Sequence, residues 1–325
     1  MNLIDVTKQF ATKESCLEYL AKLRWPEGIT CTKCGVIGDE HFRKFTTHET
    51  TRTRFSKRRK GVVTVKVPSR SLCECKGCGY QFSATTGTVF HDSHLPLEKW
   101  FMAIALILEA KKGISALQVC RNLGISQANY RTAWYLCHRI REATKETGLL
   151  TGVVETDETY LAPKKPRKGR PYVKKDKHDV VLGMIERGGR LRMVPVRDAK
   201  REIIEPVLEK HVSQDAILQT DEHPTYYIIG REKFAGHRSI NHSISYALGT
   251  LHTNTIENAF SLLKRGVYGT FHKVSIKHLG RYCNEFSYRF NRRHDQPQMF
   301  EETVKGLLKA EPLPLKRLVS GTAES

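Results

Sequence analysis

Apolar residues recur at helical spacing in three stretches of the chain's first half, which predicts where its first helices lie. Residues 13–23 form a short amphipathic pattern, and residues 97–111 carry a heavily apolar face. Residues 113–142 read as a helix, a tight turn at Gly124 and a second helix. From residue 153 onward the spacing changes to that of short strands. The pattern therefore predicts a helical first half and a second half of different architecture.

The second half alternates short strand-like runs with helical stretches. The expected strands are 153–157, 179–185, 191–196, 216–220 and 237–240, and the expected helices are 201–211, 226–229, 254–264 and 279–290. A Gly188-Gly189 turn predicts that two of these strands form a hairpin. The order strand, hairpin, helix, strand, strand, helix resembles a ribonuclease-H-like fold. We therefore expect a multidomain α+β protein with a ribonuclease-H-like α/β core at its C-terminal end.

Two CxxC-G motifs, CTKCG and CKGCG, occur within the first hundred residues. Each pair of thiolates can grip one ion while the glycine permits a tight turn, and two pairs complete a tetrahedral zinc site. The expected ligands are Cys31, Cys34, Cys75 and Cys78. The spacer of 40 residues is long for such a site, so it should contain strands of its own or an insertion. The alternative, four free buried cysteines, would leave both glycines unexplained.

The net charge of +20 indicates that the protein binds an acidic partner. Basic residues cluster at 52–60 and 164–177, and clustered positive charge favours a nucleic-acid partner over a merely soluble basic protein. Either cluster could contact phosphates or be a solvated loop. The N-terminus lacks the pattern of a signal peptide, and no apolar run approaches the ~18 residues that span a bilayer. We therefore expect a cytoplasmic, nucleoid-associated protein with no membrane contact.

The stretch 113–142 resembles a helix-turn-helix, whose second helix would follow an N-cap at Ser126 and enter the major groove of double-stranded DNA. Its candidate DNA contacts are Gln127, Asn129, Arg131 and Arg139. The alternative is an ordinary helical hairpin that packs a core.

Three acidic residues stand where a metal site could form. Asp157 and Asp221 each follow a strand-like apolar run, and Glu257 lies on the helix that begins near Asn254. Lys264 is seven residues after Glu257, about two turns, so the two side chains project from the same side. Strand ends and a late helix could bring the acids together. In a basic chain, such a site suggests metal-dependent chemistry on a polyanion.

Each acid also has a structural reading. Asp221 could cap the helix after it, and Asn254 with Glu257 fits a capping pair. If the strand alternates, Glu155 shares a face with Asp157, while Glu158 points away. The histidines that flank the late helix are His252, His272 and His278; they could contact DNA but are more often structural.

Taken together, these residues resemble an insertion-sequence transposase of the acidic-triad (DDE) class with an N-terminal zinc ribbon. The matching pieces are CTKCG…CKGCGYQFSATTGTVF, LPLEKWFMAI, KKGISALQ, VETDETYL, QTDEHPTYY and HTNTIENAFSLLKRGVYGTFHKVS. The resemblance implies a catalytic Mg²⁺ or Mn²⁺ site and DNA strand transfer at the ends of a mobile element. It places the triad at Asp157, Asp221 and Glu257, with Lys264 as the accompanying basic residue. Because some related sequences have asparagine at the third position, Asn254 or Asn258 could contribute.

The expected division of the chain follows from these segments: a zinc ribbon with its preceding helix (1–95), a helix-turn-helix-like segment (96–148), a catalytic domain (149–300) and a C-terminal tail (301–325), which should be loose after Pro312. Residues 147–152 read as a linker. The expected function is a transposase that binds terminal inverted repeats and target DNA, as a homo-oligomer on DNA. The rival functions are a zinc-ribbon DNA-binding regulator without catalysis and a metal-dependent nuclease without strand transfer.

Overall fold

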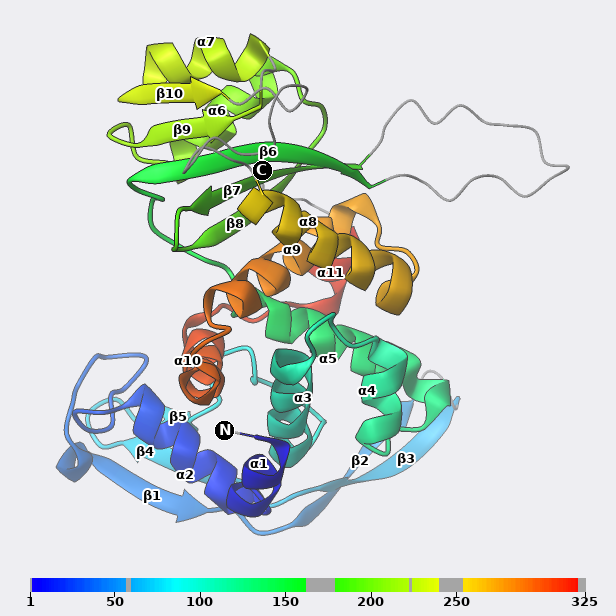
Figure 1. Ribbon diagram of the computed structural model, residues 1–325. Helices are drawn as coiled ribbons and strands as arrows, with labels where there is room; N and C mark the ends of the chain where they lie inside the picture. Colours follow the sequence, from blue (N-terminus) through cyan, green and yellow to red (C-terminus); the bar gives the residue numbers. More distant parts are fainter. Residues whose placement is uncertain (1, 57–59, 162–178, 222–223, 240–253, 321–325) are drawn as a thin grey trace, which may run out of the picture.

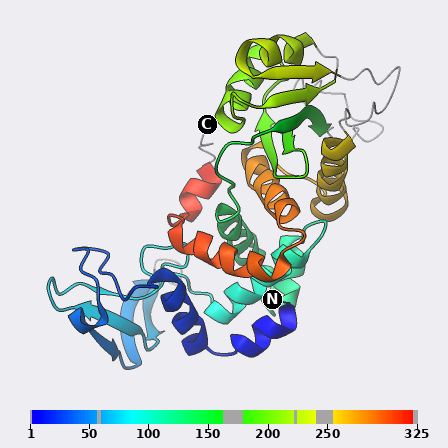
Figure 2. The same cartoon turned by 60° about the vertical axis from the view of Figure 1, so that its left-hand side comes forward.

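The computed structural model describes residues 2–56, 60–161, 179–221, 224–239 and 254–320. Figures 1 and 2 show two parts that meet at a waist, one built on a sheet and one built of helices with a small ribbon attached. The mixture of helices and strands confirms the coarse prediction of a chain with both. In the part of the chain that is described, the longest and most apolar helices still fall short of what crossing a bilayer requires.

The chain begins with two helices and a small antiparallel sheet. The elements are α1 (Leu3–Gln9), α2 (Lys13–Arg24), the short η1 (Asp39–His41), β1 (Phe42–Thr46), β4 (Ser71–Cys75) and β5 (Gln81–Phe82), and the strand order is β1-β4-β5. A separate hairpin pairs β2 (Thr50–Ser56) with β3 (Gly61–Val67). The prediction that the long spacer between the CxxC pairs contains its own strands is confirmed.

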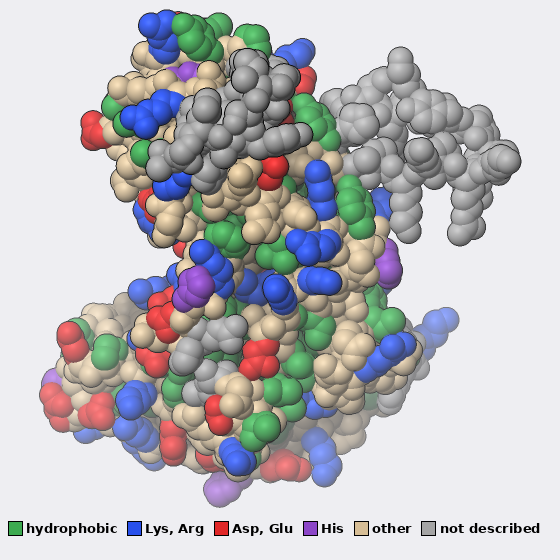
Figure 3. Space-filling model, viewed as in Figure 1, with side chains coloured by type: hydrophobic (Ala, Val, Ile, Leu, Met, Phe, Trp, Pro, Cys, Tyr) green, Lys and Arg blue, Asp and Glu red, His purple; other side chains and the backbone are tan. Residues whose placement is uncertain are grey.

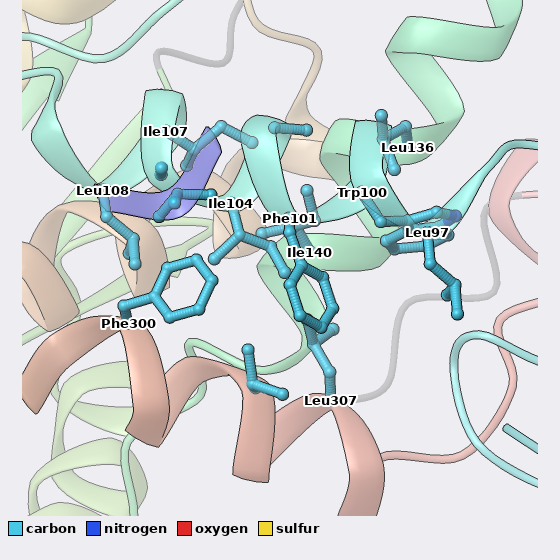
Figure 4. Close-up of a cluster of buried hydrophobic side chains, with 14 of the residues drawn as sticks. Leu97, Trp100, Phe101, Ile104, Ile107, Leu108, Leu136, Ile140, Phe300 and Leu307 are labelled. Atoms are coloured by element: carbon cyan, nitrogen blue, oxygen red, sulfur yellow. The ribbon is translucent and has the colours of Figure 1, made fainter. Parts of the chain in front are cut away.

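The helical part is built around α3 (Leu97–Glu109). It also contains α4 (Ala116–Asn122), η2 (Gln127–Asn129), α5 (Tyr130–Glu142) and α10 (Gln296–Lys309). Figure 4 shows side chains of α3 meeting Ile140 of α5 and Phe300 and Leu307 of α10. Leu20 of α2 is buried in the same cluster. The apolar face predicted for α3 is therefore the centre of a core that also takes in the chain's first helices and a late one.

Two features of the C-terminal region differ from the prediction. The segment after Pro312, expected to be loose, is ordered as far as residue 320: Leu313 and Leu318 are buried, and α11 spans Leu315–Ser320. Residues 301–309 belong to α10. The prediction of a loose segment after Pro312 is wrong as far as residue 320, because Leu313 and Leu318 are buried against other parts of the chain.

The sheet-bearing part contains five strands in the order β10-β9-β6-β7-β8. They are β6 (Val153–Leu161), β7 (Asp179–Glu186), β8 (Leu191–Val196), β9 (Ile217–Thr220) and β10 (Gly236–Ser239). Strands β6, β7 and β8 form an antiparallel meander, while β9 runs parallel to β6 and β10 runs parallel to β9. The expected hairpin at the Gly188-Gly189 turn is confirmed, and Gly188 adopts a positive φ of 73° there.

Helices cover both faces of this sheet. On one face α6 (Arg201–His211) and α7 (Pro224–Lys233) bury Ile204 and Tyr226 against the strands. On the other face lie α8 (Asn254–Arg265) and α9 (Ile276–Asn291), joined by a π-helical turn, η3 (Gly266–Phe271). The segment 147–152 is no free linker, since Leu150 is fully buried and pairs with Val212.

The two parts are joined by a buried ion pair between α5 and α9. Arg141 Nε donates to Glu285 Oε2 over 2.6 Å, and both side chains are at most 2% exposed. The Arg141 guanidinium also stacks 4.0 Å from the ring centroid of Tyr282. Because separating a buried pair of this kind leaves an uncompensated charge, it holds the helical part firmly against the sheet-bearing part.

Candidate active site and zinc site

The four predicted zinc ligands lie together in the ribbon. The sulfur atoms of Cys31, Cys34, Cys75 and Cys78 all lie within 4.8 Å of one another. The Sγ–Sγ distances are 3.7 Å for Cys31–Cys78 and 3.6 Å for Cys34–Cys75. A tetrahedral ion with Zn–S bonds of about 2.3 Å holds its sulfurs roughly 3.8 Å apart, so this arrangement fits zinc.

The glycines of the two motifs shape this site as expected. Gly35 and Gly79 have φ angles of 76° and 67°, and each donates its N–H to the carbonyl of the motif's first cysteine. A positive φ is accessible to glycine at no steric cost, which explains its place after each CxxC. Cys73 is not part of the cluster, and Cys16, Cys120 and Cys137 are buried elsewhere in the chain.

The sheet brings Asp157 and Asp221 to the same level. Glu155 of β6 is paired with Gln219 of β9, so two residues further along these parallel strands Asp157 stands beside Asp221. Asp221 immediately follows β9, as predicted, but Asp157 is the fifth residue of the nine in β6. The prediction that both aspartates end strands is wrong for Asp157. Its strand continues because β7 pairs with β6 as far as Leu161.

Electrostatics shows that the third acid is near these two. Burial, followed by the charges of Glu158, Asp221 and Glu257, raises the pKa of Asp157 to about 7, although a hydrogen bond from the Glu158 N–H opposes the shift. The charges of Asp221 and Glu257 therefore both act on the Asp157 carboxylate. Glu257 itself is exposed on the first turn of α8, which rests on the sheet through Ile256.

Glu155 has a different role from Asp157. Its carboxylate is fully buried and accepts hydrogen bonds from the N–H groups of Thr255 and Ile256, each at 3.2 Å. It also accepts from Thr255 Oγ1 at 3.0 Å and pairs with Arg187 at 3.1 Å. Glu155 thus stabilises the first turn of α8, the helix that carries Glu257. The sequence placed Glu155 on the face of Asp157 but did not reveal this role.

Glu158 points to the other face of β6, as the alternation predicted. Tyr226 of α7 donates its hydroxyl to Glu158 Oε2 over 2.5 Å. Burial and the charge of Glu158, with the hydrogen bond between them, raise the pKa of Tyr226 well above its usual value. Tyr226 was not singled out in the sequence, where nothing marked the tyrosine as the partner of a carboxylate.

The predicted helix-turn-helix contacts separate into two groups. Gln127, Asn129 and Arg131 are exposed, near the turn at Gly124, whose φ is 60°. Arg139 is only 7% exposed, stacks 4.7 Å from the centroid of Trp100 and donates to the His91 carbonyl at 3.3 Å. The prediction that Arg139 contacts DNA is wrong, because its position on α5 faces the helical core.

The second helix of this motif begins later than predicted. Ser126 precedes η2 and its side chain caps no helix, and α5 starts at Tyr130. Of the flanking histidines, His278 is buried against His138, with ring centroids 4.6 Å apart, so it is structural. His272 is exposed with a φ of 60°. His252, the basic cluster 164–177 and residues 57–59 of the other cluster lie outside the described residues.

Lys264 lies in the last turn of α8 and lines a pocket of about 780 Å³ at the junction with η3. A second cavity of about 670 Å³ lies between α2 and the ribbon, and its lining contains none of the three acids. The part of the chain around α8 therefore combines an acidic cluster at one end of the helix with a basic pocket at the other.

Comparison with protein families and relatives identifies both ends of the chain. Residues 11–81 match the transposase zinc-ribbon domain, and residues 149–291 match the ISXO2-like transposase domain. Together these matches account for about two thirds of the sequence.

Two relatives belong to mobile elements or resemble their proteins. An uncharacterized protein in transposable element ISH50 of Halobacterium salinarum is 26% identical over 302 residues, 87% of this chain and 92% of that protein. An uncharacterized transposase-like protein of Haemophilus influenzae is 28% identical over 117 residues, 35% of this chain and 94% of that protein. The chain belongs to the insertion-sequence transposases that combine an N-terminal zinc ribbon with an ISXO2-like transposase domain.

Proposed function

We propose that the protein binds the ends of an insertion sequence and catalyses metal-dependent DNA cleavage and strand transfer. The observation that carries the proposal is the register of β6 and β9, which stands Asp157 beside Asp221. Burial, and after it the charges of Glu158, Asp221 and Glu257, raises the pKa of Asp157. Carboxylates held in mutual repulsion lower their energy by binding a divalent cation.

The topology of the sheet supports a ribonuclease-H-like core. A three-stranded antiparallel meander, β6-β7-β8, is extended beyond its first strand by β9 and β10, both parallel to β6. This is the strand arrangement that the sequence order of elements suggested. In it, the first and fourth strands are neighbours, which is why acids at residues 157 and 221 meet although 64 positions separate them.

The donor set fits Mg²⁺ or Mn²⁺, because both prefer hard oxygen ligands such as carboxylates. We propose that Asp157, Asp221 and Glu257 would together hold the divalent ions that the reaction needs. When bound, such ions neutralise phosphate charge and lower the pKa of an attacking hydroxyl or water. The ribbon cysteines hold a structural zinc ion that does not take part in the reaction.

The chain's own residues orient the reaction. Glu155 fixes the first turn of α8 and thereby the position of Glu257 over the sheet. Lys264, two turns along α8, offers a point charge to the DNA backbone near the acids. We propose hydrolysis at the element's end, which frees a 3′-hydroxyl, followed by attack of that hydroxyl on target DNA at the same acids.

DNA recognition is assigned to the helical part and the ribbon. Exposed Gln127, Asn129 and Arg131 lie beside the tight turn, and the β2–β3 hairpin carries exposed Arg52 and Arg54. Terminal inverted repeats and target DNA are the proposed ligands, bound by a homo-oligomer because an element has two ends. The division at residues 95 and 148 remains our proposal, with the qualification that α1, α2 and α10 pack on the helical segment.

Glu257→Gln tests this proposal, because it removes the charge while it keeps the shape of an exposed side chain. We expect specific binding to end DNA and thermal stability to persist, while end cleavage and strand transfer with Mg²⁺ or Mn²⁺ fall below detection. Glu209→Gln, on the opposite face of the sheet, is the matched control and should cleave like the wild type.

The rival functions predict other outcomes of the same experiment. If Glu257 only caps α8, the variant loses about 0.5–2 kcal/mol of stability and keeps its activity. A regulator without catalysis shows binding but no cleavage by the wild type, and a nuclease cleaves but joins no ends. Wild-type cleavage by Glu257→Gln, with Asp157→Asn and Asp221→Asn inactive, would remove Glu257 from the triad and direct attention to Asn254 or Asn258.

A further inference from the structure

A basic pocket lies at the waist, away from the acidic cluster. It encloses about 780 Å³ and is lined by residues of the α3–α4 connection, α8 and η3: Lys112, Ser261, Lys264, Arg265, Tyr268 and Thr270. Figure 3 shows lysine and arginine side chains gathered on this face, between the sheet-bearing part and the helical part. The pocket therefore belongs to both parts of the molecule at once.

Two glycines allow the two walls of the pocket to meet. A Cβ on Gly266 would lie 2.8 Å from the Lys112 carbonyl oxygen and 2.3 Å from the ring of Phe286. A Cβ on Gly113, whose φ is 81°, would lie 2.6 Å from the ring of Phe271. Larger residues at either position would push the Lys112 turn away from η3. The walls are thus fixed by close backbone packing rather than by flexible side chains.

The chemistry of the lining suits a phosphate. Among the residues that the structure describes, it contains three cationic side chains and no carboxylate. The Arg265 guanidinium is oriented by Ser261, to which it donates at 3.1 and 3.3 Å. Hydroxyls of Tyr268 and Thr270 add donors, and Tyr268 is 42% exposed. Lysine, arginine and hydroxyl groups are the donors that proteins use to hold a DNA backbone in register.

The wall is shaped by an unusual helix. η3 is π-helical and ends at His272, whose φ is 60°. Such turns are rare and often accompany functional sites, because they redirect side chains that a continued α-helix would place elsewhere. Here the turn brings Tyr268 and Thr270 round to the side of Lys264.

We propose that this pocket binds one phosphate of the element-end DNA and sets the distance between the recognised sequence and the cleaved bond. Lys112, from the helical part, and Lys264, from the helix of Glu257, would grip the same backbone position. Seven residues of α-helix separate Glu257 from Lys264, a rise of about 10 Å. The bound phosphate therefore lies within a few nucleotides of the cleaved bond. The inference rests on the proposed transposase function.

Removal of one charge tests the contact. Lys112→Gln should weaken binding of a short end duplex about tenfold and reduce the slope of log affinity against log salt by about 0.9. Lys210→Gln, an exposed lysine on α6 across the sheet, is the matched control and should change neither quantity. An effect of Lys112→Gln no larger than that of Lys210→Gln overturns the proposal.

Addition of one negative charge to the pocket tests the phosphate contact without removing any side chain that lines it. Gly269 lines the pocket, and a Cβ there would meet nothing within 4 Å. Gly269→Glu should weaken end binding far more than Gly269→Gln, because the two side chains match in size and differ in charge. Equal effects of the two variants would show that the added side chains weaken binding by their bulk alone. The pocket would then hold no phosphate, and the proposal would be overturned. Melting curves of both verify that they fold.

The position of the phosphate is tested with end duplexes in which single phosphates are replaced by neutral methylphosphonates. For the wild type, the loss of affinity should peak at one phosphate within a few nucleotides of the cleaved bond, and Lys112→Gln should abolish that peak alone. A peak that persists in Lys112→Gln overturns the proposal. Failure of the wild type to bind or cleave end DNA would instead overturn the proposed function, so the two failures are distinguishable.

Discussion

Replacement of Glu155 should loosen α8 and displace the acid that it carries. The Glu155 carboxylate is 0% exposed and accepts from Thr255 N–H, Ile256 N–H and Thr255 Oγ1, and it pairs with Arg187. One hundred residues of sequence separate the acceptor from the helix it caps. No other change to β6 would alter α8 so directly while leaving the residues of the acidic cluster intact.

The size of the effect follows from these contacts. Removal of one partner of a buried ion pair costs about 3–5 kcal/mol, and loss of an N-terminal helix cap alone costs about 1 kcal/mol. These terms overlap, so we expect Glu155→Ala to cost about 4 kcal/mol. Glu155→Gln keeps one acceptor oxygen and should cost about 2 kcal/mol. At roughly 2 °C per kcal/mol for a chain of this length, the alanine variant should melt about 8 °C lower.

Thermal melting and amide hydrogen exchange measure this directly. Glu209→Gln serves as the control, because it breaks a pair with Lys233 whose side chains are about one third exposed, worth at most ~1 kcal/mol. In Glu155→Ala the amides of Thr255 and Ile256 should exchange faster, and cleavage should fall with them. A melting temperature within about 1 °C of the control, or unchanged exchange at those two amides, refutes the capping role.

Two further predictions concern the ribbon and the packing of α8. Cys75→Ser should lose zinc and unfold the ribbon, since structural zinc contributes folding free energy; full zinc content by elemental analysis would contradict this. Gly183→Ala places a Cβ 2.6 Å from both Ile256 Cδ1 and Phe260 Cζ, so it should cost about 1–3 kcal/mol and lower cleavage by lifting α8 from the sheet. In Gly236→Ala the added Cβ would lie 3.7 Å from Ile217 Cγ1, an ordinary contact, so this variant should melt close to the wild type. Equal melting of the two variants would show that α8 has room to move.

Local patterns predicted much of the fold because the signals they carry are local. The apolar spacing of residues 201–211 predicted α6 with the bounds observed. The two CxxC-G motifs indicated the zinc site, because each motif holds two thiolate ligands and the glycine of the turn within five residues. The C-terminal segment was misjudged, because Leu313 and Leu318 are apolar residues in a proline-containing stretch whose partners lie far away in the sequence.

Arg139, in the helical part, shows the same limit of prediction from local sequence. Arg131 and Arg139 are arginines of one helix, yet one is exposed and the other is stacked on Trp100. Which side of α5 meets solvent depends on where α3 packs, and helical periodicity alone leaves that rotation open. The contact predicted for Arg139 from its residue type is therefore wrong, because this residue lies on the face of α5 that packs on the core.

The sequence by itself determined the family, the zinc ligands and the residue types available for an acidic site. It also determined that Glu155 and Asp157 share a face, because side chains alternate along a strand. Only the tertiary structure decided that Glu155 accepts hydrogen bonds from the N-terminus of α8, while Asp157 stands beside Asp221. It likewise decided that Lys112 joins Lys264 in one pocket. The physical reason is that desolvation, capping and repulsion act between groups brought together through space, and sheet register and helix docking set those distances.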